Sequence, residues 1–390
     1  MLNPVDFYFS ELTDPRSGQN IRYPLEEILL VAVVTLLCGG QGYEDMADTG
    51  RAKLKFLRMY YPFSRGVPSE DTFRYVLMAM DAKVFGDCFA RWMSYLHGHV
   101  EGLVAIDGKC CRGSTKGPGG SPLNVVNAYC HERGVVLAAI DTPDKSNEIT
   151  VLPELLRLLD LEGCVVTLDA MGCQKKVVAQ IVEQKANYLI SLKGNQGNLH
   201  RDVAEFFDAH EQTNGNFQEP DFNADIFEYE EKSHGRHYRR RVVVTDDFCG
   251  GLKPHQKHWK GLQSVVRLES WRTVGETTTY EKRYAITSLP PEARPIAEAL
   301  RGHWSVENQD HWMLDVYFGE DASRIREGHA AKNLATLRRL CLNIARTAQK
   351  SLAKSRSVRR ILRGCAMDDK FLQDTLKRGL KPYASNTKTA

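Results

Sequence analysis

The 390-residue sequence lacks the features by which membrane, exported and disulfide-stabilised proteins are recognised. Its longest apolar run, Ile28–Gly40, is too short to span a bilayer and predicts a buried helix. The first residues, MLNPVDFYF, contain no basic n-region of a signal peptide. The ten cysteines include no CxxC pair, which favours small buried residues in a reducing compartment over a zinc knuckle. We therefore expect a cytoplasmic protein.

The composition excludes other classes and reveals an uneven charge. The chain is 42% hydrophobic and 26% charged, which excludes dominant disorder and collagen-like sequence, and its length suggests two or three domains. The net charge is only +3, but Arg338–Lys381 carries 13 Lys and Arg against 3 Asp, and Lys232–Arg241 carries five basic residues and no acid. Two basic segments on an acidic remainder indicate a polyanionic partner beside a carboxylate site. A solvated helix or loop face is the alternative for each segment.

The hydrophobic pattern divides the chain into helical and mixed parts. Residues 1–97 have helical periodicity throughout. From residue 98, three strands, a helix, a strand, a helix and a strand follow, which predicts an α/β mixed sheet with an antiparallel beginning and a parallel end. The expected domains are an all-helical N-terminal domain (1–97), a first α/β part (98–195), a β-rich insertion (196–292), a second α/β part with a long helix (293–346) and a basic helical tail (347–390).

Two aspartates stand where predicted strands end. Asp107 follows the apolar run Leu103–Ile106, and Asp169 follows Cys164–Leu168. Open α/β sheets hold ligands and catalytic groups at the carboxyl ends of their strands. Either aspartate could instead cap the turn that follows it, but two in one sheet favour a carboxylate site.

A segment near residue 300 repeats chemically active side chains at steps of four. His303, Glu307, His311 and Asp315 are therefore expected on one face of a helix. A polar outer face is the alternative, although such faces usually carry Lys and Glu rather than His and Trp. Two strand-end Asp and one helix Glu can hold two divalent cations about 4 Å apart and cleave a phosphodiester. Mg²⁺ suits such a site, because carboxylates, waters and phosphate oxygens complete its octahedron.

Five motifs in the sequence resemble the bacterial insertion-sequence DDE transposases, and the H repeat-associated type in particular. They are Ala105-Ile-Asp-Gly-Lys109, Lys145-Ser-Asn-Glu148, Thr167-Leu-Asp-Ala-Met-Gly-Cys-Gln174, Leu192-Lys-Gly-Asn-Gln196 and Arg301-Gly-His-Trp-Ser-Val-Glu-Asn-Gln-Asp-His-Trp-Met-Leu-Asp-Val316. The last motif is long and specific. The resemblance runs from the amino-terminal helices to about Arg346.

The resemblance implies an RNase H-like catalytic domain, with a mixed sheet that carries helices on both faces and is interrupted by a β insertion. It implies an Asp–Asp–Glu triad at Asp107, Asp169 and Glu307, with Mg²⁺ or Mn²⁺ as the cofactor. The 138 residues between Asp169 and Glu307 leave room for the insertion. Double-stranded DNA, as element ends and target, is the implied partner, and a homodimer is the implied assembly in the synaptic complex.

Several residues near the expected site are candidates for DNA contact. In related transposases a Tyr, an Arg and a Lys flank the Glu, and here Leu300, His303 and Leu314 hold those positions. The predicted DNA-binding residues are Lys109, Gln174, Lys193, Arg239, Arg240, Arg241, His303 and His311. Solvated turn or helix-start positions are the alternatives for the two lysines and the glutamine. Trp304 and Trp312 form a second stripe that could pack on the sheet or stack on an unpaired base.

Glu148 is a rival third carboxylate, although its place in the first turn of a helix also suits a residue that stabilises the helix dipole. The function that the sequence predicts is a DNA transposase, which cleaves the ends of an insertion sequence and transfers the freed 3′-OH to target DNA. The helical N-terminal domain is the candidate for recognising the ends. An inactive or repurposed DNA-binding relative is one alternative. A zinc hydrolase with His303, Glu307 and His311 as ligands is another. The active protein would be cytoplasmic, and nucleoid-associated when bound to DNA.

Overall fold

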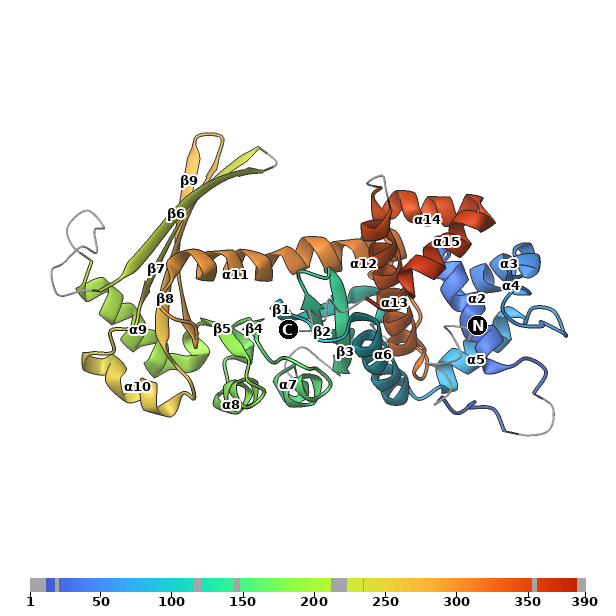
Figure 1. Ribbon diagram of the computed structural model, residues 1–390, viewed down its shortest axis with the longest axis horizontal. Coiled ribbons are helices and arrows are strands. Elements are labelled where there is room, and N and C mark those ends of the chain that lie inside the picture. The colour runs from blue at the N-terminus through green and yellow to red at the C-terminus, as the bar shows by residue number, and fades with distance from the viewer. Residues whose placement is uncertain are drawn as a thin grey trace, which may run out of the picture. The chain divides into compact units, whose positions relative to one another are not determined.

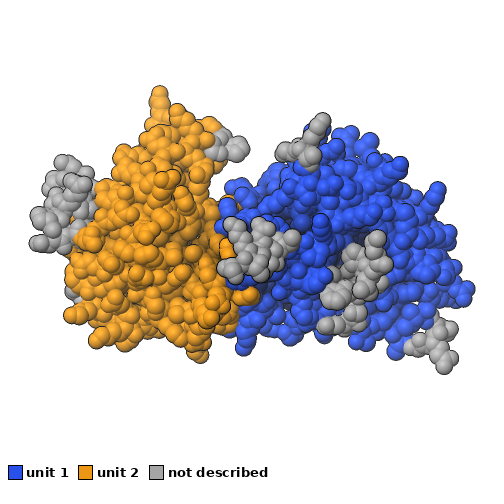
Figure 2. Space-filling view, in the orientation of Figure 1, with its two compact units in different colours: residues 1–100, 108–159, 306–390 blue, residues 101–107, 160–305 orange. Residues whose placement is uncertain are grey.

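The computed structural model describes residues 12–17, 21–115, 121–142, 148–211, 223–233, 235–352 and 356–383. Two compact units make up the chain, namely unit 1 with Met1–Val100, Gly108–Leu159 and Val306–Ala390, and unit 2 with Glu101–Asp107 and Asp160–Ser305 (Figure 2). Strand β1 (Gly102–Cys111) contributes to both units, because the division falls after Asp107. Within the predicted motifs, Lys145–Asn147 and His234 lie outside the described residues.

Unit 1 opens with helices. They are α2 (Leu25–Leu37), α3 (Tyr43–Ala52), α4 (Leu54–Leu57), α5 (Glu70–Ala79) and α6 (Ala82–His97). Almost every residue of α2 is buried, so the apolar run does form the predicted buried helix. Helix α6 begins where the Asp81 carboxylate accepts hydrogen bonds from the backbone N–H groups of Lys83 and Val84, which satisfies donors that a helix start leaves unpaired. None of the described helices of the chain combines the length and the apolar character that crossing a membrane requires.

The rest of unit 1 is built around one long buried helix. A hairpin of β2 (Leu123–Cys130) and β3 (Val135–Thr142) precedes α7 (Glu148–Arg157), and the chain returns with α12 (Trp312–Phe318), α13 (Ala330–Ser351), α14 (Val358–Met367) and α15 (Asp369–Gly379). Helix α13 packs against α2, α5, α6 and β3 (Figure 1). Three arginines of the basic segment Arg338–Lys381 are buried along it, namely Arg338, Arg339 and Arg346. Part of the positive charge of this segment is therefore internal to unit 1.

A large mixed sheet dominates unit 2. Its further strands are β4 (Cys164–Leu168), β5 (Asn187–Leu192), β6 (Asp225–Ser233), β7 (Arg236–Thr245), β8 (Ser264–Val274) and β9 (Thr277–Thr287). Hydrogen-bonded neighbours follow the order β1-β4-β5-β9-β8-β7-β6 in unit 2 and β3-β2-β1 in unit 1. Strands β1, β4 and β5 are parallel, and β9, β8, β7 and β6 continue antiparallel from β5. The predicted mixed α/β class is confirmed, and the predicted insertion strands extend the same sheet.

Two of the expectations about these strands are wrong. Asp107 lies inside β1 and not beyond its end, although the pairing of β1 with β4 stops at Ile106. An apolar run in the sequence shows which residues are buried, but it does not show where the hydrogen bonds of a strand end. Strand β1 therefore continues beside β2 beyond its apolar residues. The basic segment Lys232–Arg241 forms the end of β6 and most of β7, so its alternative, a solvated helix or loop face, is wrong. Charged residues on both strands concealed the alternating pattern of this hairpin.

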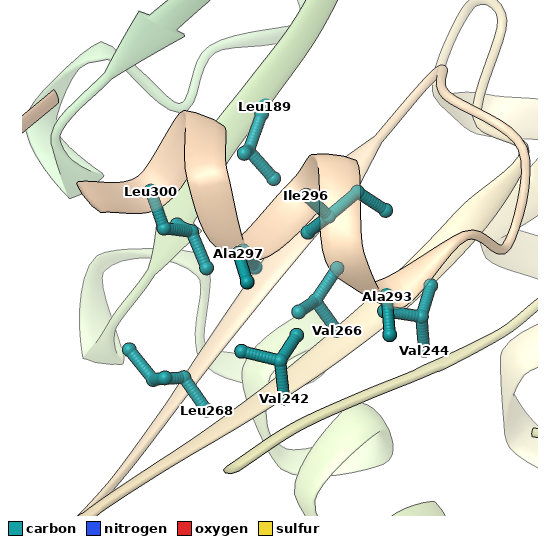
Figure 3. Close-up of a cluster of buried hydrophobic side chains, with 10 residues drawn as sticks. Leu189, Val242, Val244, Val266, Leu268, Ala293, Ile296, Ala297 and Leu300 are labelled. Carbon is teal, nitrogen blue, oxygen red and sulfur yellow. The ribbon is translucent and has the colours of Figure 1, made fainter. Parts of the chain in front are cut away.

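Helices cover both faces of the sheet in unit 2. They are α8 (Lys175–Glu183), α9 (Gly197–Ala209), α10 (Lys253–His258) and α11 (Ala293–Val306). Val266 and Leu268 of β8 point toward α11 (Figure 3). Arg267 lies between them in sequence and therefore points to the opposite face, where its guanidinium pairs with Glu211 at 2.8 Å and with Asp208 of α9 at 3.6 Å.

Helix α11 is fixed to the sheet by a compact apolar cluster. Its residues Ala293, Ile296, Ala297 and Leu300 lie over Leu189, Val242, Val244, Val266, Leu268 and Ala285 of the strands (Figure 3). The Asp225 carboxylate accepts a hydrogen bond from the backbone N–H of Ala293 at 2.7 Å, which holds the start of the helix. The sequence predicts one helix that carries His303, Glu307, His311 and Asp315. Instead, a π-helical turn, Glu307–His311, separates α11 from α12.

Replacing Ile296 by Ala should test how strongly this cluster holds α11. The side chain is fully buried, so the change removes apolar contacts and leaves a cavity. We expect the free energy of unfolding to fall by roughly 2–5 kcal/mol, measured by chemical denaturation. Glu298→Ala, an exposed change on the same helix, should stay within about 0.5 kcal/mol of the unchanged protein. Equal stability of the two variants would contradict the packing described here.

Candidate functional site

Two aspartates occupy equivalent positions on neighbouring parallel strands in unit 2. The last paired row of β1 and β4 joins Ile106 to Leu168, so the next residue of each strand is Asp107 and Asp169. Neighbouring strands lie about 4.8 Å apart, which brings the two residues together at the end of that pairing. Both side chains are partly exposed, whereas Ile106 and Leu168 are buried. Two carboxyl groups thus come to the surface at one edge of the sheet.

The carboxylate of Asp169 is held in one orientation by the turn that follows it. Its Oδ1 atom accepts hydrogen bonds from the backbone N–H groups of Met171 at 3.0 Å and Gly172 at 3.3 Å. The capping role that was the alternative for this residue is therefore real. Because both bonds reach the same oxygen, Oδ2 can bind a cation at the same time. Capping and cation binding are compatible for this side chain.

Two amide side chains, whose roles the sequence analysis missed, hold the loop after Asp169. The Asn195 amide donates to the carbonyl oxygen of Ala170 at 2.6 Å, and the Gln196 amide donates to that of Cys173 at 2.7 Å. Both residues belong to the loop that follows β5. Two consecutive amide side chains after a strand can form hydrogen bonds to backbone groups, but the sequence does not show which loop supplies those groups.

Lys193 and Gln174 lie in the loops that follow β5 and β4. Lys193 is exposed and can reach an anionic ligand near this edge of the sheet. Gln174 is the N-cap residue of α8, as its alternative reading suggested, and its amide lies 3.5 Å from the carbonyl oxygen of Met171. The positions of Lys193 and Gln174 are both compatible with the DNA contact predicted for them.

His303 is attached to the strand that leads to Asp169. Its Nδ1 lies 2.9 Å from the hydroxyl of Thr167 on β4. Thr167 is two residues before Asp169, and side chains two residues apart project from the same face of a strand. If the hydroxyl donates this bond, Nε2 of the neutral ring carries the proton and can donate to another group. This end of α11 is thereby connected to the strand.

The expected stripe of His303, Glu307, His311 and Asp315 is broken by the π turn. The backbone N–H of Trp312 donates to the carbonyl oxygen of Glu307, which is the i→i+5 pattern of a π-helix. Glu307 is exposed, as is Trp312 at 48%, whereas the side chain of His311 is only 14% exposed. Glu307 and His311 therefore differ in exposure, and their common role in one site stays a prediction.

The two tryptophans of this segment have different surroundings. Trp304 packs beside the apolar cluster of α11, with the guanidinium groups of Arg240 and Arg283 at 5.2 and 5.3 Å from its ring centre. Trp312 makes an edge-on contact with Tyr317 and stays half-exposed. The expected packing on the sheet is confirmed for Trp304 alone.

The positions that hold Tyr and Lys in related transposases belong to the core here. Leu300 is 8% exposed and lies in the α11 cluster, and Leu314 of α12 is fully buried. Neither side chain can contact DNA without unfolding its surroundings. Of the three flanking positions, only His303 holds a group that can bind phosphate.

Lys109 is buried in a cluster of carboxylates, which argues against the phosphate contact predicted for it. Its ammonium group lies 2.6 Å from Asp315, 3.6 Å from Asp321 and 3.9 Å from Glu320, and its side chain is 5% exposed. Burial alone would lower the pKa of Lys109, but the carboxylates of Glu320, Asp315 and Asp321 raise it above its usual value. The lysine therefore stays charged and ties β1 to α12 within unit 1.

The three arginines of the basic segment are paired with acids on the sheet. Arg239 pairs with Glu228 at 2.9 Å, Arg240 with Glu231 at 3.3 Å, and Arg241 with Glu228 at 3.3 Å and with Glu269 at 3.7 Å. The segment predicted to bind DNA is therefore part of the sheet, and β6 and β8 supply counter-charges for its three consecutive arginines. Side-chain exposure is 52% for Arg239 but 14% for the other two, so only Arg239 remains well placed for a phosphate.

Glu148, the rival third carboxylate, lies against the backbone of β1. It is the first residue of α7 and is 8% exposed. A Cβ atom at Gly108 would stand 2.6 Å from the Glu148 carboxyl carbon, a distance that real contacts do not reach. Only a glycine at position 108 leaves room for the Glu148 carboxyl group. Glu148 therefore lies beside β1, next to the residue that follows Asp107.

The donor atoms at this edge of the sheet suit a hard divalent cation. Asp107 and Asp169 offer carboxylate oxygens, which Mg²⁺ prefers. In the part of the chain that the structure describes, no group of three or more His, Cys, Asp or Glu side chains lies close enough to hold a metal ion. The predicted convergence of three carboxylates therefore stays a prediction, and the pair of aspartates is what the geometry provides.

The role of Lys109 can be tested by Lys109→Met, which keeps the length of the side chain and removes its charge. Asp315 would then lose its cation and face the other two acids, although Glu320 keeps the guanidinium of Arg339 at 2.8 Å. We expect the free energy of unfolding to fall by about 3 kcal/mol, measured by chemical denaturation at neutral pH. Lys193→Met, at an exposed lysine, should change it by no more than about 0.5 kcal/mol. A Lys109→Met protein as stable as the unchanged one would show that the cluster does not need its cation.

Comparison with known proteins adds independent observations. The family described as "Transposase DDE domain" matches residues 98–344, and that described as "DDE_Tnp_1-associated" matches residues 7–93. The chain is 38% identical over 347 residues to "Putative transposase YncI" of Escherichia coli O157:H7, covering 87% of this chain and 86% of that protein. It is 35% identical over 375 residues to "H repeat-associated putative transposase YhhI" of Escherichia coli (strain K12), covering 95% and 96%.

A solved structure, titled "Cryo-EM structure of piggyBac transposase synaptic complex with hairpin DNA (SNHP)", aligns over 98% of this chain and 82% of that chain. Its TM-score of 0.46 at 10% identity is too low to establish a shared fold. The family match and the two relatives cover most of the chain and confirm the resemblance inferred from the motifs. The chain therefore belongs to the bacterial DDE transposases of the H repeat-associated type.

Proposed function

We propose that this protein is an active transposase that cleaves DNA strands at the ends of an insertion sequence and joins the freed 3′-OH to target DNA. One observation carries the proposal. In a chain of the DDE family, the row Ile106–Leu168 ends the pairing of two parallel strands, and an aspartate follows on each. Cleavage and transfer are both displacements at phosphorus, so one site can serve both steps.

Asp107, Asp169 and Glu307 are the proposed ligands of Mg²⁺ or Mn²⁺. When bound, the metal ions activate the attacking oxygen and stabilise the leaving oxygen. The two aspartates provide a rigid half of the site, because they project from paired strands and Asp169 is fixed by two backbone N–H groups. Glu307 is exposed at the start of the π turn, four residues after His303. The attachment of His303 to Thr167 supports a location of this helix near the aspartates.

His303 is proposed to contact a phosphate near the scissile bond. Its Nδ1 lies 2.9 Å from the hydroxyl of Thr167, two residues before Asp169. Lys193 is exposed on the loop after β5 and is proposed to contact the DNA backbone, with Gln174 as a weaker candidate. His311 and Lys109 leave the set, because one is largely buried and the other is bound by carboxylates.

The assignment of parts of the chain to tasks is also proposed. The helices of residues 1–97 would recognise the element ends, and residues 98–195 and 293–346 would form an RNase H-like catalytic domain with residues 196–292 inserted. A homodimer would hold two ends together in the synaptic complex. Affinity for DNA would depend on salt, because contacts to phosphates release counter-ions.

The triad can be tested by Asp107→Asn, Asp169→Asn and Glu307→Gln, made one at a time. Each change removes a negatively charged metal ligand and keeps the shape of the side chain. With Mg²⁺ and labelled element ends, we expect cleavage to slow by roughly three orders of magnitude or more, while DNA binding is retained. Glu298→Gln, the same chemical change at an exposed position of α11, should cleave at the normal rate. Normal cleavage by any triad variant would remove that residue from the site.

Arg239 and Arg240 should respond differently to replacement by Ala. Arg239 is half-exposed, so its loss should lower the slope of log affinity against log salt by about 1, measured by DNA binding over a salt series. Arg240 is held by Glu231 and by the ring of Trp304, so its loss should lower the melting temperature and leave the slope nearly unchanged. If Arg239→Ala leaves the slope unchanged, Arg239 does not contact DNA and the role of the three arginines is structural.

A further inference from the structure

We propose that Gln309 and Asp310 are positioning residues that hold the π turn and thereby set the direction of Glu307. The inference rests on the proposed function, in which Glu307 is a metal ligand. Glu307 and Asn308 are exposed, whereas Gln309 is partly buried and Asp310 fully buried. The turn therefore presents its first two residues to solvent and directs the next ones into unit 1.

Asp310 is anchored through β2 to the long helix α13. Its Oδ2 accepts a hydrogen bond from Nδ2 of the Asn127 side chain at 3.1 Å, and Oδ1 of the same side chain accepts one from Nε of Arg339 at 2.6 Å. Arg339 also donates to the Glu320 carboxylate at 2.8 Å. All four side chains are buried. A buried chain of charged groups is stable only when each member keeps its partner, so it holds Asp310 firmly.

Gln309 has a second, separate anchor on the same strand. Its Oε1 accepts a hydrogen bond from the hydroxyl of Tyr129 at 2.8 Å. The Tyr129 hydroxyl in turn accepts one from Arg346 at 3.2 Å, and Arg346 donates to the carbonyl oxygen of Gly134 at 2.8 Å. Asn127 and Tyr129 are two residues apart and project from one face of β2. Two consecutive residues of the turn are therefore bound to two points on one strand.

These anchors matter because a π turn is not the preferred form of a helix. It contains one residue more per turn than an α-helix and is found mainly as single turns, often at functional sites. If the turn relaxed to α-helix, the residues before it would rotate by about 100° relative to those after it. Glu307 is the first residue of the turn, so its carboxylate would point elsewhere. The anchors thus determine where Glu307 points.

The test uses Asn127→Ala and Tyr129→Phe, each of which cuts one anchor without touching Glu307. Asn343→Ala is the matched control, because it removes two hydrogen bonds between α13 and the backbone of Val136 on β3 and none to the π turn. For each full-length protein, the rise in melting temperature is measured against Mn²⁺ concentration without DNA, which gives an apparent metal affinity. Cleavage of labelled element ends with Mg²⁺ is measured in parallel.

We expect Asn127→Ala and Tyr129→Phe to lower the apparent metal affinity and the cleavage rate by about 10–100-fold each, the range seen when residues that orient metal ligands are changed. Asn343→Ala should lower the melting temperature without metal by a similar amount and keep the affinity and the rate of the unchanged protein. Anchor variants that lose stability like Asn343→Ala but bind Mn²⁺ normally would overturn the inference.

Glu307→Gln separates that failure from a failure of the proposed function. If it loses metal binding and cleavage while the anchor variants keep both, Glu307 is a ligand and the anchors do not position it. If Glu307→Gln itself binds Mn²⁺ and cleaves normally, the proposed role of Glu307 is wrong, and the inference falls with it.

Discussion

The parallel pairing of β1 with β4 is the constraint on which the proposed chemistry depends. It ends at one row, Ile106 with Leu168, and so delivers Asp107 and Asp169 to the same edge. The other contacts described at this edge fix the segments that surround the two aspartates. Asn195 and Gln196 hold the loop that carries Asp169, and Thr167 holds the end of α11 through His303. A sheet is rigid because each strand is paired, and this rigidity suits two groups that would repel each other as bare carboxylates.

Much of the protein's positive charge is used for its own structure. Lys109, Arg267 and Arg339 are buried among carboxylates, and Arg240 is held by Glu231 and by an aromatic ring. A buried cation requires a partner, and here the partner comes from another strand or helix. Runs of basic residues therefore overstate the surface that is open to DNA. Of the three consecutive arginines 239–241, only Arg239 stays half-exposed.

Motifs and hydrophobic periodicity predicted the larger features correctly. The apolar run Ile28–Gly40 forms α2, the mixed sheet is present, and the family follows from short strings of residues such as Ala105–Lys109 and Arg301–Val316. These features depend on neighbours along the chain, which a sequence displays directly. The candidate acids Asp107 and Asp169 belong to the same group, because a strand and the residue after its buried part are local features.

Pairing between distant segments decided the rest. The sequence by itself determined the class of fold and the family, because each is written in consecutive residues. Only the tertiary structure decided that Arg239, Arg240 and Arg241 pair with acids of the neighbouring strands, that Lys109 binds Asp315, and that the turn after Val306 is π-helical. Each of these results from contacts between residues far apart in the chain, such as Asn127 with Asp310. The spacing of residues along one helix does not reveal which strand the helix will pack against.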